Sequence, residues 1–217
     1  MNDLSLIQQL IIWVPPVLFA ITLHEVAHGW MARALGDRTA EASGRLSLNP
    51  LRHIDPLGTV LLPGLLYIMS GFIFGWAKPV PVTWSNLKNP RRDGALVALA
   101  GPGANLLMLL GWMTVIKFGQ FLGEELRFFS EPLVYMGGAG IAINGVLMVL
   151  NLFPLPPLDG SRVVQALLPR PAARWYEQLE PYGLLILLLL LATGLLGRLI
   201  GPVLSVLDQI VQYALGI

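Results

Sequence analysis

Residues 4–35 read LSLIQQLIIWVPPVLFAITLHEVAHGWMARAL, and this apolar stretch decides the fold class. About 20 consecutive apolar residues are enough for a helix to cross the hydrocarbon core of a membrane. The rest of the chain is also strongly apolar, because 55% of its 217 residues are hydrophobic, 12% are charged and its mean hydropathy is +0.67. Soluble domains have a different balance, so the composition predicts a membrane protein.

Further apolar stretches follow the first one along the chain. They cover residues 57–76, 94–118, 133–153 and 182–200, and residues 202–217 are a sixth candidate. The sequence therefore predicts an all-α polytopic membrane protein with about five or six transmembrane or re-entrant helices. Short extended segments are expected at residues 45–48 and 78–83, where residues alternate or prolines are frequent.

No repeat and no long polar stretch divides the chain, so we expect one membrane-embedded domain over residues 1–217. Its core is expected at about residues 10–168, and its C-terminal helices at about residues 182–217. The first apolar stretch has no basic region before it and no cleavage site of small residues, so we expect it to be retained.

The composition also limits the metal ligands and the partners. The chain has no cysteine, so disulfides and thiolate ligands are excluded, and a metal site must use nitrogen and oxygen ligands. The formal net charge is only +1, and no nucleic-acid partner is predicted.

The sequence HEVAH at residues 24–28 lies inside the first apolar stretch. His24 and His28 are four residues apart, so on a helix their imidazoles project from one face and can share a tetrahedral zinc ion. In such a site Glu25 would accept a proton from the metal-bound water and pass it to the leaving amine. Ionisable groups are costly inside a membrane, which favours a functional site over a polar cluster that only ties helices together.

A catalytic zinc ion needs a third protein ligand and an open position for water. The side-chain chemistry allows His53, Asp55, Asp93 and Asp159. Asp159 stands out, because the segment NLFPLPPLDG at residues 151–160 interrupts an apolar helix with three prolines. Irregular backbone is tolerated in a membrane only where protein buries it or where it lines a wet cavity. The alternative is that Asp159 caps the helix that follows.

Taken together, HEVAH at residues 24–28 and NLFPLPPLDG at residues 151–160 resemble the paired motifs of the site-2 protease family of intramembrane zinc metalloproteases. GPGAN at residues 101–105 is similar to a further membrane motif of that family. The resemblance covers about residues 10–168. It implies one catalytic Zn²⁺ ion held by His24, His28 and Asp159, with Glu25 as the general acid and base. It also implies Asn151 as a candidate to polarise the substrate carbonyl or to stabilise the oxyanion.

The resemblance also implies the substrates, which would be transmembrane proteins cut in or near their membrane-spanning segments. GRLSLNPL at residues 44–51 and GWAKPVPV at residues 75–82 resemble a compact subgroup without PDZ or CBS domains. Substrate selection by such domains is therefore not expected. The sequence identifies neither the physiological substrate nor the oligomeric state.

Charge and the number of crossings predict the topology. If Asp159 joins His24 and His28 on one ion, the ends of the first apolar stretch and of residues 133–153 lie at similar depth. Residues 57–76 are then expected to enter and leave the membrane on the same face. The alternative is that they span the membrane. Basic residues then gather at one face, which the positive-inside rule makes cytoplasmic. The expected location is a prokaryotic cell membrane, crossed several times, with the active site nearer the cytoplasm.

Several polar residues have more than one interpretation. Asn105 and Asn144 are expected to form hydrogen bonds between helices. His53 is expected to shape a turn, with a role beside the metal as the alternative. For the whole chain, the competing function is a zinc- or ion-handling transporter or an inactive membrane scaffold.

Overall fold

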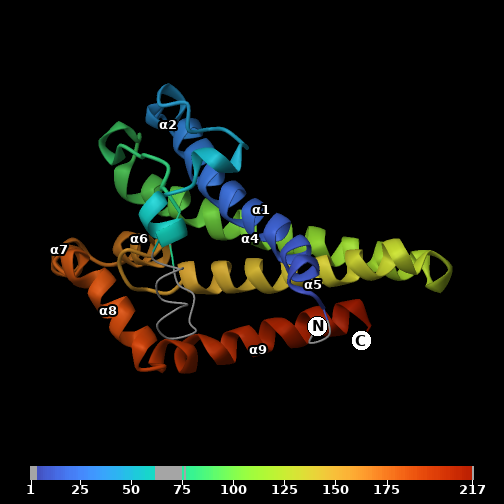
Figure 1. The fold of residues 1–217 in the computed structure, drawn as a ribbon. Helices are drawn as coiled ribbons and strands as arrows, with labels where there is room; N and C mark the ends of the chain where they lie inside the picture. The colour runs from blue at the N-terminus through green and yellow to red at the C-terminus, as the bar shows by residue number, and fades with distance from the viewer. Residues whose placement is uncertain (1–3, 62–74, 76, 217) are drawn as a thin grey trace.

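The structure is a computed structural model that describes residues 4–61, 75 and 77–216, and its regular elements in these residues are all helices (Figure 1). The longest are α1 (Leu6–Ala34), α4 (Pro90–Leu122), α5 (Arg127–Asn151) and α9 (Leu195–Leu215). The shorter ones are α2 (Thr39–Ala42), α6 (Asp159–Leu167), α7 (Arg170–Glu177) and α8 (Glu180–Ala192). Single turns lie at η1 (Pro50–Arg52), η2 (Pro56–Leu61), η3 (Trp84–Asn86) and η4 (Glu124–Leu126).

Four helical stretches in the described residues are long and apolar enough to cross a membrane. They are Leu6–Ala34, Pro90–Leu122, Glu124–Asn151 and Leu195–Leu215, and α8 is a shorter apolar helix. The predicted class of all-α membrane protein is therefore confirmed. The apolar stretch predicted at residues 57–76 lies almost entirely outside the described residues.

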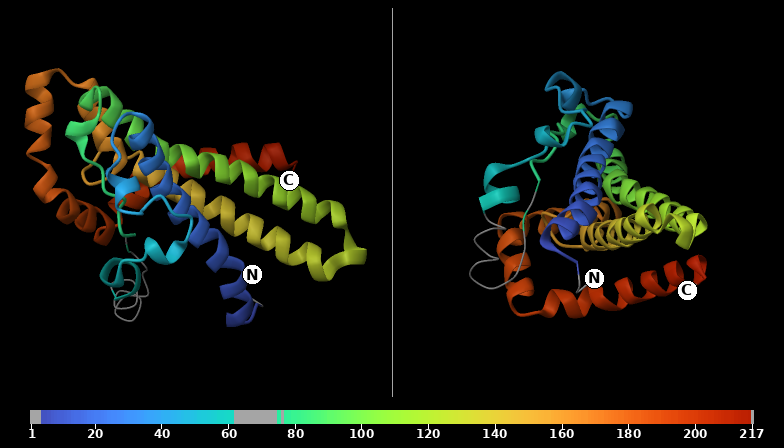
Figure 2. Two further views of the ribbon diagram at one scale, coloured as in Figure 1. Left: turned by 90° about the horizontal axis from the view of Figure 1, so that it is seen from above. Right: turned by 45° about the vertical axis from the view of Figure 1, so that its right-hand side comes forward.

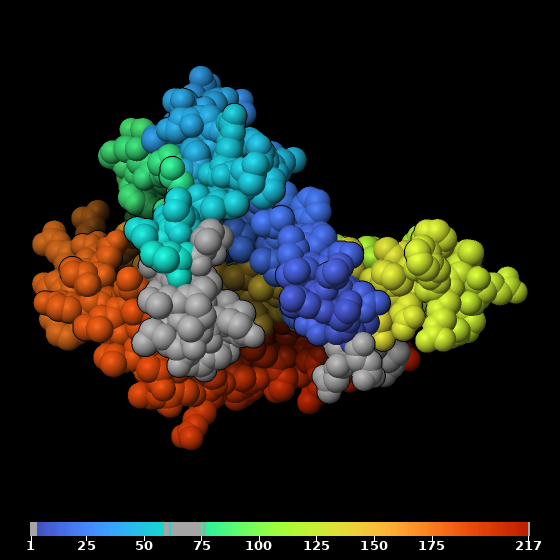
Figure 3. Space-filling model, in the orientation of Figure 1, coloured from blue at the N-terminus to red at the C-terminus, as the bar shows by residue number. Residues whose placement is uncertain are grey.

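Helices α4 and α5 form a long antiparallel hairpin, whose turn projects from the rest of the molecule in yellow at the right of Figure 3. Two glycines of α5 allow close packing. A Cβ on Gly137 would lie 2.4 Å from Ile116 Cγ1, and one on Gly140 would lie 2.3 Å from the Trp112 ring. Small residues at such contacts let helix backbones approach in a membrane, where packing replaces the hydrophobic effect.

Helix α1 crosses this hairpin, and its C-terminal end meets the start of α4 (Figure 2). Lys88 N donates to Leu35 O at 3.3 Å, and Ala32, Leu87 and Val97 form a buried cluster beside this bond. Because α5 returns along α4, its end also lies near the end of α1. The fold thus gathers the two predicted motifs at one end of the bundle.

The boundary between the last two helices differs from the sequence prediction. Stretches were expected at residues 182–200 and 202–217, but α8 ends at Ala192 and α9 begins at Leu195. Gly194 has a φ of +69°, which favours glycine, and this residue ends the regular helix. Pro202 lies inside α9 instead of breaking it, as transmembrane helices tolerate.

The proline segment between α5 and α6 is held in place by α8. Leu155 and Leu158 of this segment form a buried cluster with Leu187 of α8 and Leu196 of α9. Gly183 of α8 lies directly against the segment, because a Cβ there would come within 2.0 Å of Pro156 O. The C-terminal helices therefore fix the residues that lead into Asp159.

Asp37 organises the connection that follows α1. Its buried carboxylate accepts hydrogen bonds from Thr39 N and Oγ1, from Thr83 N at 2.8 Å and from Asn86 Nδ2 at 3.0 Å. Desolvation alone would raise the pKa of Asp37, but the hydrogen bonds from Thr39, Asn86 and Thr83 outweigh it and lower the pKa. One carboxylate thus ties the start of α2 and the distant segment of residues 83–86 to the end of α1.

We expect Asp37→Asn to lower the free energy of unfolding at pH 7 by about 1–3 kcal/mol. In the variant an amide NH₂ group replaces one accepting carboxylate oxygen, and it faces a buried group that is itself a hydrogen-bond donor. A lowered pKa in the folded protein means that the carboxylate stabilises the fold above its ordinary pKa. This contribution is lost as the pH falls through the lowered value. Thermal unfolding in detergent should therefore show a gap between wild type and variant that closes in acid. Glu125→Gln, at an exposed position of the distant turn, is the control.

Candidate metal centre

Helix α1 presents both histidines of the HEVAH motif on one face. The His24 and His28 rings lie edge to face with centroids 4.6 Å apart, and their Nε2 atoms are 3.1 Å apart. Four residues make slightly more than one helical turn, which accounts for this proximity. The predicted pairing of the two imidazoles is therefore present in the fold.

Asp159 comes from a distant part of the chain, and its carboxylate forms a triangle with the two imidazoles. It is the first residue of α6, and its Oδ2 lies 3.3 Å from both His24 Nε2 and His28 Nε2. Leu158 occupies the N-cap position and makes no side-chain capping bond. The carboxylate of Asp159 thus faces the two histidines, and the alternative prediction that it caps the helix finds no support in this geometry.

The hydrogen bonds on the far side of each ring determine the tautomers. His24 Nδ1 lies 2.6 Å from Asn105 Oδ1, and His28 Nδ1 lies 2.7 Å from the backbone oxygen of Val97. Because both partners accept, each Nδ1 carries the proton, and each Nε2 turns a lone pair toward Asp159. Hydrogen-bonded imidazoles of this kind are usual in metal sites.

The site fits a metal ion. Three acceptor atoms that face one another repel unless a cation or a proton lies between them, and Asp159 Oδ2 is buried without a hydrogen-bond partner among the described residues. Zinc–ligand bonds of 2.0–2.1 Å place tetrahedral ligand atoms about 3.3–3.4 Å apart. The distances of 3.1, 3.3 and 3.3 Å match this spacing. One tetrahedral ion fits all three ligands.

Two glycines make room for this arrangement. A Cβ on Gly101 of α4 would lie 2.4 Å from His28 Nε2 and 2.6 Å from His24 Cε1. A Cβ on Gly160 would lie 2.2 Å from Leu152 O, where the start of α6 presses against the end of α5. Gly101 of GPGAN and Gly160 of the Asp-Gly pair are thus explained by close approach. Sequence reasoning had assigned Gly101 no function.

A buried amide pair supports His24 from behind. Asn105 Nδ2 donates to Asn144 Oδ1 at 2.9 Å, and Asn144 Nδ2 donates to Gly140 O at 2.8 Å. Neither side chain is exposed to solvent. The prediction of hydrogen bonds between helices is confirmed for both residues. In addition, this chain fixes the amide of Asn105 so that its oxygen faces His24.

Glu25 lies beside the histidines, at the contact between α1 and the segment 77–83. Its Oε2 accepts a hydrogen bond from Val80 N at 2.8 Å. Gly29, one turn further along α1, lets Val80 Cγ1 come within 3.0 Å of the position of a Cβ. Among the described residues, the other carboxylate oxygen of Glu25 makes no hydrogen bond. The carboxylate is thus held by one oxygen.

The other candidate residues lie apart from this triangle. Asn151, at the end of α5, donates from Nδ2 to Leu147 O at 2.9 Å within its own helix. His53 is buried and its Nε2 faces Ser47 O at 2.8 Å, so it holds a loop together. Asp55 accepts from Leu57 N and Gly58 N, and Asp93 accepts from Asn89 N at the start of α4. In the described residues, the one group of side chains suited to a metal is His24, His28 and Asp159.

Comparison with known proteins places this site in a family. The chain is 38% identical over 203 residues to a Bacillus subtilis protein named "Putative zinc metalloprotease YwhC", covering 93% of this chain and 88% of the relative. It is 32% identical over 202 residues to "Putative zinc metalloprotease Rip2" of Mycolicibacterium smegmatis, covering 91% and 73%. The chain belongs to the site-2 protease family of zinc metalloproteases.

A third relative is similar to this site-2 protease over most of its chain. "Putative zinc metalloprotease Rip2" of Mycobacterium tuberculosis H37Rv is 31% identical over 196 residues, covering 88% of this chain and 71% of the relative. No family model and no solved structure matches the chain. As a site-2 protease, the chain is a membrane metalloprotease that uses zinc, and two imidazole nitrogens with one carboxylate oxygen suit that metal.

Proposed function

We propose that this chain cuts peptide bonds in or near the transmembrane segments of membrane proteins. One observation carries the proposal. Two of the three ligands, His24 and His28, belong to α1, a helix long and apolar enough to cross a membrane, and the Asp159 carboxylate meets them there. Glu25 lies on the same helix beside them. An ionisable cluster at such a position is functional by default. We assign His24, His28 and Asp159 as the ligands of a single Zn²⁺ ion.

When bound there, zinc lowers the pKa of a water molecule and polarises a substrate carbonyl. Glu25 then takes the proton of the attacking water and later gives it to the leaving nitrogen of the cut peptide bond. The hydrogen bond from Val80 N fixes Oε2, which leaves the second carboxylate oxygen to exchange the proton. The hydrogen bonds of His24 and His28 keep both rings in the ligating orientation. A carbonyl-polarising role for Asn151 remains a prediction. The bond to Leu147 O uses one N–H of the amide, and the other N–H is left to donate to a substrate carbonyl.

The depth of the site supports access from one face of the membrane. His28 precedes the last residue of α1, Ala34, by six residues, and His24 precedes it by ten. At about 1.5 Å per residue, these ligands lie roughly 9 and 15 Å from that helix end, within a hydrocarbon core about 30 Å thick. The basic residues Lys88, Arg91 and Arg92 lie where α4 begins, beside the same end. By the positive-inside rule this face is cytoplasmic, and the bacterial relatives fit a prokaryotic cell membrane.

A substrate helix must unwind before it is cut, because a helix hides its carbonyl groups in its own hydrogen bonds. The segment 77–83 has no helix or strand and lies next to Glu25, where an edge for an unwound substrate would be placed. Its own donors are mostly used, since Lys78 N binds His53 O, Val80 N binds Glu25 and Thr83 N binds Asp37. Pro79 and Pro81 have no N–H group. A substrate strand would therefore pair mainly with carbonyl oxygens here.

The contacts around residues 54–77 support a segment that enters and leaves on one face. Lys78 N donates to His53 O at 2.9 Å, and Arg45 Nη2 donates to Lys78 O at 2.8 Å. Two chain positions that touch outside the hydrocarbon core lie on the same side of a membrane. We therefore expect cysteines placed at residues 52 and 88 to react with an impermeant thiol reagent from the same side. The chain has no native cysteine, so only the introduced ones can react with the reagent. Labelling from opposite sides would rule out this topology.

A zinc- or ion-handling transporter is the rival function. A transporter needs exchangeable ligands along a path, whereas Glu25 beside paired histidines has a direct part in hydrolysis. The test compares the membrane proteomes of cells that carry wild-type protein or Glu25→Gln. Fragments cut within transmembrane segments should appear only with the wild type. If both cell types contain the same fragments, the proposal is wrong.

A further inference from the structure

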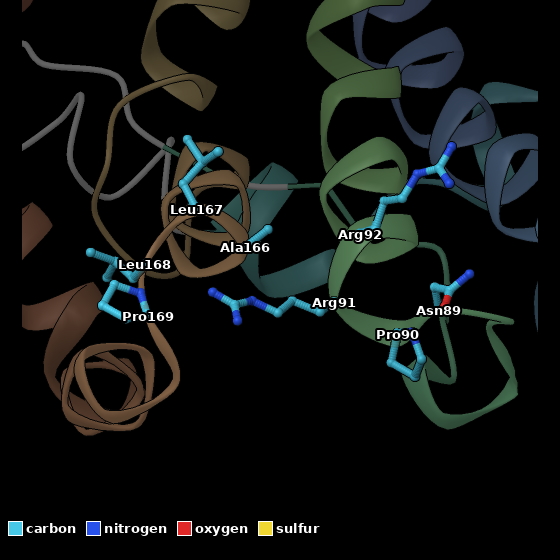
Figure 4. Close-up of a pocket in the computed structure, with 8 residues that line it drawn as sticks. All are labelled: Asn89, Pro90, Arg91, Arg92, Ala166, Leu167, Leu168 and Pro169. Carbon is cyan, nitrogen blue, oxygen red and sulfur yellow. The ribbon is translucent and has the colours of Figure 1, made fainter.

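A groove lined by arginines lies where α4 begins and α6 joins α7. One hollow of about 750 Å³ is lined by Asn89, Pro90, Arg91, Arg92 and residues 166–169. A second hollow of about 370 Å³ shares Pro90, Arg91 and Ala166 with it, and adds Arg162, Arg170, Arg174 and Glu177 to the lining. Figure 4 shows Arg91 reaching from α4 toward the α6–α7 connection. Both volumes are in the range of small-molecule sites, about 300–1,000 Å³.

The positive charge of this groove is only partly neutralised. Arg162 pairs with Glu180 at 2.8 Å and lies over the Trp84 ring, and Arg91 donates to Gln165 O at 3.3 Å. In the part of the chain that the structure describes, Arg170 and Arg174 make no ion pair. Glu177, the acidic residue of the lining, accepts from Gln165 Nε2 at 2.7 Å. An anionic ligand would find arginines from α4, α6 and α7 in the linings of the two hollows, and guanidinium suits phosphate oxygens.

The surroundings of the groove are those of a membrane surface. Helix α4 enters its apolar stretch directly after Arg91 and Arg92, so these residues lie at the head of a candidate membrane span. In the lining of the first hollow, Leu167 is 79% exposed. Trp175, which follows Arg174 on α7 but lines neither hollow, is 72% exposed. Tryptophan gathers at the boundary between lipid and water. A soluble anion would gain nothing from these apolar groups, whereas the glycerol and acyl chains of a lipid would.

We propose that this groove binds the phosphate headgroup of an anionic phospholipid from the leaflet on the side of the basic residues. Arg91, Arg170 and Arg174 hold the phosphate, and Leu167 contacts the upper part of an acyl chain. Because α6 begins with Asp159, a lipid in this groove also braces the helix that carries that ligand. The proposal does not depend on the substrate of the protease.

The experiment measures lipid binding by native mass spectrometry of the full chain in detergent. Wild type should retain phosphatidylglycerol and lose phosphatidylcholine. Each basic residue near an anionic membrane surface contributes about fivefold in affinity, so Arg170→Gln/Arg174→Gln should weaken phosphatidylglycerol binding by about 25-fold. The control Arg127→Gln/Arg198→Gln removes the same charge at exposed positions outside the groove and should leave binding unchanged.

Folding controls, a second variant and a competition with phosphate accompany this measurement. Helical circular dichroism and zinc content of each variant establish that it is folded. If the double variant does not fold, Arg91→Gln alone should reduce phosphatidylglycerol binding by about fivefold. Equal binding of the two lipids, or equal loss in the groove and control variants, would overturn the proposal. Displacement of the lipid by millimolar inorganic phosphate would assign the groove to a free anion instead.

Discussion

Replacing Asp159 with alanine is expected to empty the metal site. Wild-type protein should carry one zinc ion per chain, and Asp159→Ala should carry almost none after purification. Two histidine nitrogens remain in the variant, but a catalytic zinc site needs three protein ligands. The loss also leaves His24 Nε2 and His28 Nε2 facing each other at 3.1 Å without a counter-charge. Elemental analysis of the detergent-purified protein measures this directly.

His53→Ala is the control for that experiment. His53 is the third histidine of the chain, and sequence chemistry allowed it as a ligand, but its Nε2 faces Ser47 O in a loop. We expect the variant to keep its zinc. Zinc that survives Asp159→Ala but is lost in His53→Ala would overturn the assignment of the ligands.

Glu25→Gln is expected to reduce hydrolysis by about 10²–10⁴-fold, the usual contribution of a general acid and base. Zinc content should stay at the wild-type level, because Glu25 is not a ligand in this assignment. The glutamine oxygen can still accept the hydrogen bond from Val80 N, so the neighbouring segment keeps its position. Initial rates on a reconstituted membrane substrate, together with zinc analysis, separate the two effects.

Glu41→Gln is the matched control for charge. Glu41 lies in α2, pairs with Arg33 at the surface and has no contact with the metal ligands, so activity should be unchanged. A transporter that depends on the ligands would keep its transport in Glu25→Gln. Hydrolysis at the wild-type rate in Glu25→Gln would show that another group moves the proton.

The sequence alone predicted the parts of this fold that rest on strong local patterns. The apolar run of residues 4–35 predicted α1, and the spacing of His24 and His28 predicted their shared face. Asp159 was singled out because prolines interrupt the regular helix there, and a membrane tolerates irregular backbone only where protein buries it or where it lines a wet cavity. Each of these inferences depends on neighbours within a few residues, where helix geometry leaves little freedom.

Features that depend on distant contacts were not predictable in the same way. The orienting hydrogen bond from His24 Nδ1 to Asn105 Oδ1 joins residues 81 positions apart, and the one between Thr83 and Asp37 joins residues 46 positions apart. The need for Gly101 appears only when α4 lies against the two imidazoles. The break at Gly194 was misplaced because the apolar run continues through it, and Pro202 was the more conspicuous signal.

Mapping the cut sites in a reconstituted transmembrane substrate tests the central claim most directly. Purified protein and substrate are placed in liposomes, and mass spectrometry locates the new peptide ends. The account predicts cuts within the membrane segment that are absent with Glu25→Gln. Glycine, proline or asparagine near the cut should speed cleavage because they lower the cost of unwinding, and leucine at those positions should slow it. Cuts confined to the soluble tails, or rates that do not depend on helix stability, would contradict the account.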